Sequence, residues 1–353
     1  MANIKMAYLA TYFFISLIFT IFLFRMLMIE SNTFLKIYDH PNNRKIHEHK
    51  ILKIGGIAII FSSLFVLLLY RLINGEKLFE VSSSELSFIF STFLLLCGAL
   101  FDDLIGINAP KKLFFQLIAI FSIVNSGLVF EVFNDNIANF IVTTILFILI
   151  INSMNLIDGV DGLSVSLLLV FTFFALLVSS YLHMLDPKYY IVISIFLGSF
   201  FAFLSFNFPP AKIFLGDTGS QLLGWLFALF IIHFSSYFDY PSQKLYVLSF
   251  ISLPFYDVFF VMLKRFYLSS SGLFERIVRI VKPDQNHIHH LVLKSNFTDK
   301  DCTLLLVCFY FLLSSISIIP ILIERFYLLI FVVVLVLNIL FRIFFEYKSN
   351  QRS

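Results

Sequence analysis

The sequence predicts an all-α protein that crosses a membrane about eleven times. Of its 353 residues, 59% are hydrophobic and only 13% are charged, whereas about a quarter are charged in ordinary soluble domains. Phe supplies 48 positions and Trp only one, a bulky apolar composition that suits helices facing lipid. The bilayer is therefore the expected solvent, and the whole chain, 1–353, is expected to form a single transmembrane domain.

Eleven apolar runs approach the roughly 20 residues that a helix needs to span the hydrocarbon core. They lie near residues 7–29, 54–73, 86–101, 113–130, 137–154, 162–184, 189–206, 220–238, 245–263, 303–322 and 326–345. The first run is too long for the core of a signal peptide and has no small-residue cleavage site after it. We therefore expect it to remain as a permanent span.

The basic residues between the runs predict the orientation. Most Lys and Arg residues fall in one alternating set of connections, which the positive-inside rule places in the cytoplasm. This puts the N-terminus outside and the C-terminus inside. The same inward connections hold nearly all the unusual polar residues, in motif loops at 30–53, 102–112, 152–162, 207–220 and 264–302. The small net charge of +3 does not indicate nucleic-acid binding.

The first two motif loops combine acids with cations. Loop 30–53 carries Arg44, Lys45, His47 and Lys53 before the pair of glycines that opens the second helix. A membrane anchor would explain Arg44, Lys45 and Lys53, but not Asp39, Pro41 and His47.

The next loop places Asp102 and Asp103 at the end of the third helix, before Lys111 and Lys112. Adjacent carboxylates at a membrane boundary need partners, although a solvated acidic pair at a helix end is the alternative.

The third motif loop aligns amide and carboxylate side chains. Asn152, Asn155, Asp158 and Asp161 follow one another at steps of three, which places them on one face of a helix until Gly159 and Gly162 interrupt it. Such a row suits a sugar, a ribose or a metal-bound phosphate better than it suits a plain turn.

The fourth motif loop places Asp217, flanked by Gly216 and Gly219, at the start of the eighth helix, after Asn207 and Phe214. An N-cap is one interpretation of this aspartate. Together with the other acids, however, it favours a ligand of Mg²⁺, or of Mn²⁺ in its place.

The last motif loop carries His287, His289 and His290. Three histidines could bind Zn²⁺, but no cysteine joins them, and we expect contact with a phosphate or a sugar instead. Upstream, residues 273–282 have the spacing of an amphipathic helix suited to an anionic membrane surface, with packing on the protein as the alternative.

The order of these motifs resembles that of a known enzyme family, the polyprenyl-phosphate N-acetylhexosamine-1-phosphate transferases of glycosyltransferase family 4. The patterns that carry the resemblance are DxPxxRKxH, DD, NxxNxxDGxDGL, FNxxPAxxFxGDxGS and HxHH. The HIHH form is similar to the subgroup that initiates envelope glycans, not to the peptidoglycan branch with its histidine triplet. The chain differs from the subgroup's usual pattern at Lys50, Leu52 and Gln285.

The resemblance implies transfer of a HexNAc-1-phosphate, with GlcNAc-1-phosphate expected, from a UDP-sugar to undecaprenyl phosphate at the cytoplasmic face of a bacterial inner membrane. UMP would be released. Asp217 would bind Mg²⁺, Asp102 and Asp103 would belong to the lipid-phosphate site, and the implied nucleotide-sugar site consists of Asn155, Asp158, Asp161, Asn207 and Phe214. Membrane lipids are the other expected partners, and the oligomeric state, a homodimer included, stays open.

The motifs and the resemblance together give two sets of predicted site residues. The predicted catalytic residues are Asp102, Asp103, Asp158 and Asp161, with Asp217 as metal ligand. The predicted substrate-binding residues are Arg44, Lys45, His47, Lys53, Lys111, Lys112, Asn152, Asn155, Asn207, Phe214, His287, His289 and His290. An ion-coupled transporter of a lipid or sugar anion is the rival hypothesis, but it predicts acids in the middle of spans, whereas here they gather at inward helix ends.

Overall fold

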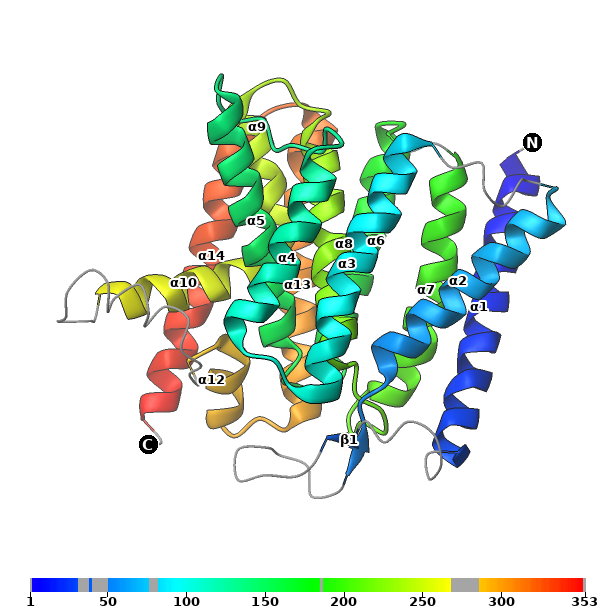
Figure 1. The fold of residues 1–353 in the computed structure, drawn as a ribbon. Coiled ribbons are helices and arrows are strands. Elements are labelled where there is room, and N and C mark those ends of the chain that lie inside the picture. Colours follow the sequence, from blue (N-terminus) through cyan, green and yellow to red (C-terminus); the bar gives the residue numbers. More distant parts are fainter. Residues whose placement is uncertain are drawn as a thin grey trace. The chain divides into compact units, whose positions relative to one another are not determined.

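The computed structural model describes residues 2–30, 38–39, 50–75, 82–184, 187–267 and 286–351 (Figure 1). The chain forms two compact units, each built from two stretches of sequence. The first unit comprises Met1–Gly127 and Ser179–Leu223, and the second comprises Leu128–Val178 and Gly224–Ser353.

Helices dominate the described residues, with one short two-stranded sheet. The elements are α1 (Ala2–Glu30), β1 (Tyr38–Asp39), β2 (Ile51–Leu52), α2 (Gly55–Ile73), α3 (Ser83–Ile105), α4 (Ala109–Val124), α5 (Asn136–Ile157), α6 (Leu163–Tyr181), α7 (Pro187–Asn207), α8 (Gly216–Ser235), α9 (Pro241–Tyr246), a 3₁₀ turn (Val247–Ile251), α10 (Ser252–Tyr267), α12 (Ile288–Lys294), α13 (Asp299–Ile323) and α14 (Tyr327–Asn350). The all-α, multi-span prediction is confirmed.

Each of the eleven predicted runs contains a helix, and ten of the described helical segments are long and apolar enough to cross a membrane. The exception is α4, which has 16 residues and at 1.5 Å per residue rises only about 24 Å. It ends earlier than the predicted 113–130 because Asn125 caps it and Gly127 adopts a positive φ of 98°. The segment from α9 to α10 forms one span, Pro241–Tyr267.

Polar residues define where several helices begin. Ser82 and Glu85 form a capping box at α3, and the Asn108 side chain accepts a hydrogen bond from Lys111 N at the start of α4. Asp135 and Thr298 cap α5 and α13 in the same way. These side chains satisfy amide groups that the first turn of a helix leaves without partners.

In the first unit, a cluster of buried hydroxyl groups joins α1, α2 and α7, which lie side by side (Figure 1). Ser199 Oγ on α7 lies 2.8 Å from Ser16 Oγ, 3.1 Å from Thr20 Oγ1, 3.1 Å from Ser62 Oγ and 3.0 Å from Ser63 Oγ. Burial of apolar surface does not drive helices together within lipid, so polar contacts and close packing must do so. This hydroxyl cluster therefore stabilises the three-helix contact.

The start of α2 is joined to the segment that precedes α8, also within the first unit. Gly55 N donates to the Phe214 carbonyl at 2.9 Å, and Gly56 N donates to the Leu215 carbonyl at 2.7 Å. A Cβ atom at Gly56 would lie only 2.2 Å from Gly219 N. The glycine pair that opens this helix therefore permits a close approach of the two backbones.

In the second unit, aromatic side chains fill the contacts of α8 with α5 and α6. The Trp225 ring lies 4.9 Å from the Phe147 ring, and Phe171 stacks on Phe227 at 4.2 Å between centroids. A Cβ atom at Gly224 would lie 2.5 Å from Ile151 Cα, so α8 approaches the backbone of α5 closely at that position. This packing holds the C-terminal end of α5, where the third motif loop begins.

Candidate functional site

Three distant motif loops of the first unit bring five charged side chains together. Lys53 Nζ lies 2.8 Å from Asp103 Oδ1 and 2.8 Å from Asp217 Oδ2. Lys112 Nζ lies 2.9 Å from Asp102 Oδ2 and 2.5 Å from Asp217 Oδ1. We call these five residues the lysine–aspartate cluster. Each lysine bridges two carboxylates, and Asp217 is shared by both lysines.

Both lysines of the cluster stay protonated. Burial by itself lowers the pKa of Lys53, but the charges of Asp217 and Asp103 and their hydrogen bonds outweigh this effect and raise the pKa above its usual value. The pKa of Lys112 is also raised, because Asp217 and Asp102 outweigh the opposing effect of burial. The cluster therefore contains two fixed positive charges among three carboxylates, an arrangement able to exchange carboxylate partners for phosphate oxygens.

Asp103 serves the N-terminus of α8. Its Oδ1 accepts a hydrogen bond from Asp217 N at 2.8 Å, and its Oδ2 accepts bonds from Thr218 N at 2.8 Å and Thr218 Oγ1 at 2.6 Å. The side chain is only 1% exposed. Asp103 thus supplies from α3 the cap that α8 needs, and it fixes the position of Asp217.

Asp102, the other member of the acidic pair, lies in a different environment. Its Oδ1 accepts a hydrogen bond from Ile107 N at 3.0 Å, and its Oδ2 faces Lys112. With 15% of its side chain exposed, it is more accessible than Asp103. Neighbouring residues on a helix point in different directions. Asp103 therefore contacts the first turn of α8, whereas Asp102 contacts Lys112 and the backbone that follows its own helix.

One carboxylate of the cluster could hold a divalent cation together with phosphate oxygens of a substrate. Among the residues that the structure describes, no three His, Cys, Asp or Glu side chains are arranged to hold a metal ion. Mg²⁺, however, is commonly held by one or two carboxylates together with phosphate oxygens. Asp217, in the first turn of α8 with 20% of its side chain exposed, offers such a carboxylate.

Other residues predicted for the site in the first unit have structural contacts. Asn207 is buried, and its Nδ2 donates to the Ile213 carbonyl at 2.9 Å, which closes the turn that follows α7. Phe214 is half-buried, and its backbone bonds with Leu52 and Gly55. Lys111 is exposed at the start of α4, whereas its neighbour Lys112 joins the cluster.

The third motif loop belongs to the second unit. Asn152 and Asn155 lie on α5 and are half-buried, as are Asp158 and Asp161. The helix ends at Ile157, so both aspartates lie in the turn beyond it and do not continue the helical face that their spacing predicted. Asp158 caps the end, and its Oδ1 accepts a 2.5 Å hydrogen bond from Ser164 Oγ.

The histidine motif lies against this turn, within the same unit. A Cβ atom at Gly159 would lie 3.4 Å from His289 Nε2. The rings of His287 and His289 are stacked 6.0 Å apart, and the His290 ring lies 4.2 Å from that of His289. Burial, and then the charge of His290, lowers the pKa of His289 to about 3, so this ring is neutral at physiological pH.

Several predicted residues lie outside the described part of the chain. They are Arg44, Lys45 and His47 in the first motif loop and the amphipathic stretch 273–282. The predictions for them stay predictions.

The structure also brings in polar residues that the sequence patterns did not single out. Asp257 on α10 and Arg342 on α14 form a buried ion pair at 2.6 Å, and Asp257 also contacts the histidine motif. Each is a lone charge inside an apolar run, and a charge within a span is itself a signal of function. That signal could have identified both residues.

Comparison with known proteins identifies a family match and several relatives. The family model of glycosyl transferase family 4 matches residues 85–235, the part of the chain that contains both aspartate pairs and Asp217. A probable undecaprenyl-phosphate N-acetylglucosaminyl 1-phosphate transferase of Bacillus subtilis (strain 168) is 26% identical over 79% of this chain and 76% of its own length.

Two further relatives extend the similarity. An undecaprenyl-phosphate alpha-N-acetylglucosaminyl 1-phosphate transferase of Thermotoga maritima is 27% identical over 86% of this chain and 87% of its own length. A decaprenyl-phosphate N-acetylglucosaminephosphotransferase of Mycolicibacterium smegmatis is 28% identical over 76% of this chain and 71% of its own length. Residues 85–235 of this multi-span chain thus match glycosyl transferase family 4, and the chain is similar over most of its length to polyprenyl-phosphate N-acetylglucosamine-phosphate transferases.

Proposed function

We propose that the protein transfers GlcNAc-1-phosphate from UDP-GlcNAc to undecaprenyl phosphate and releases UMP. The observation that carries the proposal is the lysine–aspartate cluster, in which two half-buried ammonium groups share three carboxylates at the N-terminus of α8. Cations beside a helix N-terminus suit phosphate groups, and carboxylates there suit the accompanying metal ion. The names of the three relatives support transfer of an N-acetylglucosamine phosphate to a polyprenyl phosphate, which is undecaprenyl phosphate in two names and decaprenyl phosphate in the third.

In this reaction the two lysines bind phosphate oxygens. Lys53 and Lys112 are charged before substrate arrives, and each can exchange a carboxylate partner for a phosphate. The second pKa of a phosphate monoester is about 6, so the lipid phosphate is already largely ionised at neutral pH. Asp102 then orients Lys112 and does not need to remove a proton.

We assign Asp217 as the ligand of Mg²⁺, or of Mn²⁺ in its place. When bound, the ion would neutralise charge on the pyrophosphate and help to hold the reacting groups in line. Asp103 contributes by fixing the first turn of α8, and with it the backbone position of Asp217. If Lys53 and Lys112 exchange the Asp217 carboxylate for phosphate oxygens, that carboxylate becomes available to the metal ion.

We assign recognition of the sugar donor to the polar residues of the third motif loop and the histidine motif. Carboxylates and amides such as Asp158, Asp161 and Asn155 suit the hydroxyl groups of a sugar or ribose. A neutral His289 can donate one hydrogen bond and accept another. The active site is proposed to face the cytoplasm of a bacterial inner membrane, where the product would start a lipid-linked envelope glycan.

The test is release of UMP by the purified protein in detergent with undecaprenyl phosphate, UDP-GlcNAc and Mg²⁺. We expect UMP and a lipid-linked sugar phosphate in equal amounts, and no UMP without the prenyl phosphate. A panel of UDP-GlcNAc, UDP-GalNAc and UDP-glucose identifies the donor. Asp239→Asn, which alters an exposed acid beyond the C-terminal end of α8, is the matched control for Asp217→Asn.

The transporter hypothesis predicts a different result. Protein in proteoliposomes would then move a lipid or sugar anion in response to an ion gradient, and the detergent assay would yield no UMP. That pair of results would refute the proposed function.

A further inference from the structure

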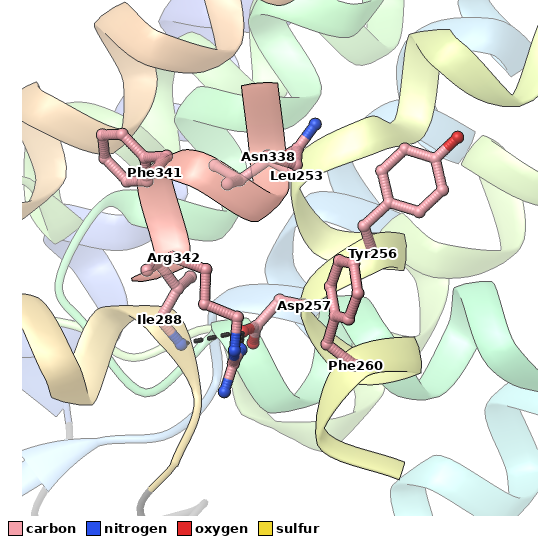
Figure 2. Close-up of a pocket in the computed structure, with 8 residues that line it drawn as sticks. All are labelled: Leu253, Tyr256, Asp257, Phe260, Ile288, Asn338, Phe341 and Arg342. Atoms are coloured by element: carbon pink, nitrogen blue, oxygen red, sulfur yellow. Dashed lines mark hydrogen bonds and ion pairs between the residues drawn. The ribbon is translucent and has the colours of Figure 1, made fainter. Parts of the chain in front are cut away.

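A buried carboxylate holds the histidine motif in place. Asp257 on α10 is 7% exposed. Its Oδ2 lies 2.8 Å from His287 Nδ1, while its Oδ1 accepts hydrogen bonds from Ile288 N at 2.9 Å and Arg342 Nη1 at 2.6 Å. Figure 2 shows Arg342 and Ile288 both directed toward Asp257.

Arg342 extends this hold to the backbone. Its Nη2 donates to the Asn286 carbonyl at 2.6 Å, and its Nε donates to Glu346 Oε1 at 3.1 Å. Glu346 in turn accepts a hydrogen bond from Lys264 Nζ at 3.2 Å. Asp257 and Arg342, from two different helices, thus fix the chain just before His287, the His287 ring and the amide just after it.

The contacts of Asp257 also determine which nitrogen of His287 carries the proton. Asp257 pairs with the guanidinium of Arg342, and a carboxylate in such a pair can only accept hydrogen bonds. A neutral His287 must therefore carry its proton on Nδ1, and the lone pair then lies on Nε2 at the other edge of the ring. Because His287 stacks on His289, the same contacts orient the neighbouring ring.

Stability alone does not account for such a pair. A buried ion pair is often no more stabilising than apolar side chains of similar volume. The Asp257–Arg342 pair does, however, determine which ring nitrogen of His287 carries the proton.

We infer that Asp257 and Arg342 are positioning residues, which hold His287 as the Nδ1-protonated tautomer and so present its Nε2 as an acceptor to the sugar donor. The inference rests on the proposed function, in which the histidine motif contacts that donor. Neither residue needs to touch substrate. Their effect reaches the reaction through His287.

The first arm of the test reads the tautomer directly. In protein labelled with ¹⁵N-histidine, the ring nitrogen shifts of His287, assigned by comparison with His287→Gln, should show a proton on Nδ1. In Asp257→Asn, the amide oxygen can still accept from Ile288 N or Arg342, and its NH₂ group then faces the ring. We expect the proton to move to Nε2.

The second arm measures the reaction. For Asp257→Asn we expect kcat/KM for UDP-GlcNAc to fall by roughly 10- to 100-fold, the range found when a group that orients a metal-binding histidine is removed. The KM for undecaprenyl phosphate should not change. The double variant Asp257→Asn/Arg342→Gln leaves no unpaired buried charge, so it keeps the test valid if the single variant fails to fold. It should show the same kinetic loss.

Lys264→Met is the matched control, because it removes a cation from the exposed end of the same network, where Lys264 is 44% exposed. It should leave both the tautomer and the kinetics as in the wild type. A folded double variant with wild-type kcat/KM, or an Nε2-protonated His287 in the wild type, would overturn the inference. A wild type that releases no UMP refutes the proposed function instead, and the inference then stands or falls on the histidine spectra.

Discussion

Asp103→Asn should destabilise the protein far more than Asp102→Asn, although the two aspartates are adjacent. Asp103 accepts three hydrogen bonds from the first turn of α8 and pairs with the Lys53 ammonium, at 2.6–2.8 Å and with only 1% exposure. An Asn can accept through one oxygen only, and its NH₂ group would face backbone N–H groups or the Lys53 ammonium.

The size of this effect follows from the hydrogen bonds that Asn cannot form. A hydrogen bond to a charged group is worth about 1.5–3 kcal/mol, and a buried donor without a partner costs about 1–3 kcal/mol. Because Asn can keep one or two of the hydrogen bonds, we expect Asp103→Asn to lower the free energy of unfolding by about 2–4 kcal/mol. In Asp102→Asn the side chain at this position stays partly exposed, and Lys112 still pairs with Asp217. We therefore expect the free energy of unfolding to decrease by about 1 kcal/mol or less.

The assay is thermal unfolding of each purified variant in the same detergent, together with UMP release. Both variants should turn over slowly, but only Asp103→Asn should lower Tm clearly. Equal Tm values for the two variants would show that the N-terminus of α8 does not depend on Asp103. A wild-type rate in both would remove the pair from the proposed mechanism.

Three further predictions concern other parts of the chain. Asp217→Asn should slow turnover strongly and raise the Mg²⁺ requirement, because it removes the carboxylate charge that we assign to the metal and that both lysines share; near-normal turnover at ordinary Mg²⁺ would contradict the metal assignment. Gly56→Ala should lower Tm and the yield of monodisperse protein in size-exclusion chromatography, because its Cβ would lie 2.2 Å from the Gly219 backbone, which has no room to move; an unchanged Tm would refute this packing argument. Replacing Phe274 and Ile277 by Asp, in the stretch outside the described residues, should reduce activity in anionic bilayers more than in detergent, whereas an equal loss in both media would indicate packing on the protein.

The sequence predicted the helices well because lipid imposes a simple rule on them. A run of apolar residues must be helical within the bilayer, so all eleven runs contain helices. Asp217 was expected at the start of a helix because glycines flank it, and α8 begins at Gly216. Helix ends were harder to predict. Asp158 and Asp161 lie past the end of α5, because Asp158 is the C-cap residue and the positive φ of Gly162 is incompatible with a continuing helix.

Residue spacing could not predict which side chains meet across the chain. Lys53 and Asp217 are separated by 164 positions, and the sequence assigned both to phosphate chemistry without indicating that they form an ion pair. Nor did it distinguish the buried capping role of Asp103 from the more exposed position of Asp102. Asp257 and Arg342 were missed because each is a single charge with no neighbouring pattern.

The hydroxyl cluster of the first unit also has a consequence for how the chain is synthesised. Its members on α1 and α2 leave the ribosome long before Ser199 on α7, since α3 to α6 come between. During that interval Thr20 Oγ1 can donate to the Ser16 carbonyl, at 2.7 Å, and Ser62 Oγ to the Ile59 carbonyl, at 3.0 Å, each within its own helix. An unsatisfied polar group in lipid costs several kcal/mol, so these local bonds allow α1 and α2 to reside in the bilayer as separate spans. When α7 is inserted, Ser199 meets partners that are already in the membrane, and the first unit is completed only after two helices of the second have been made.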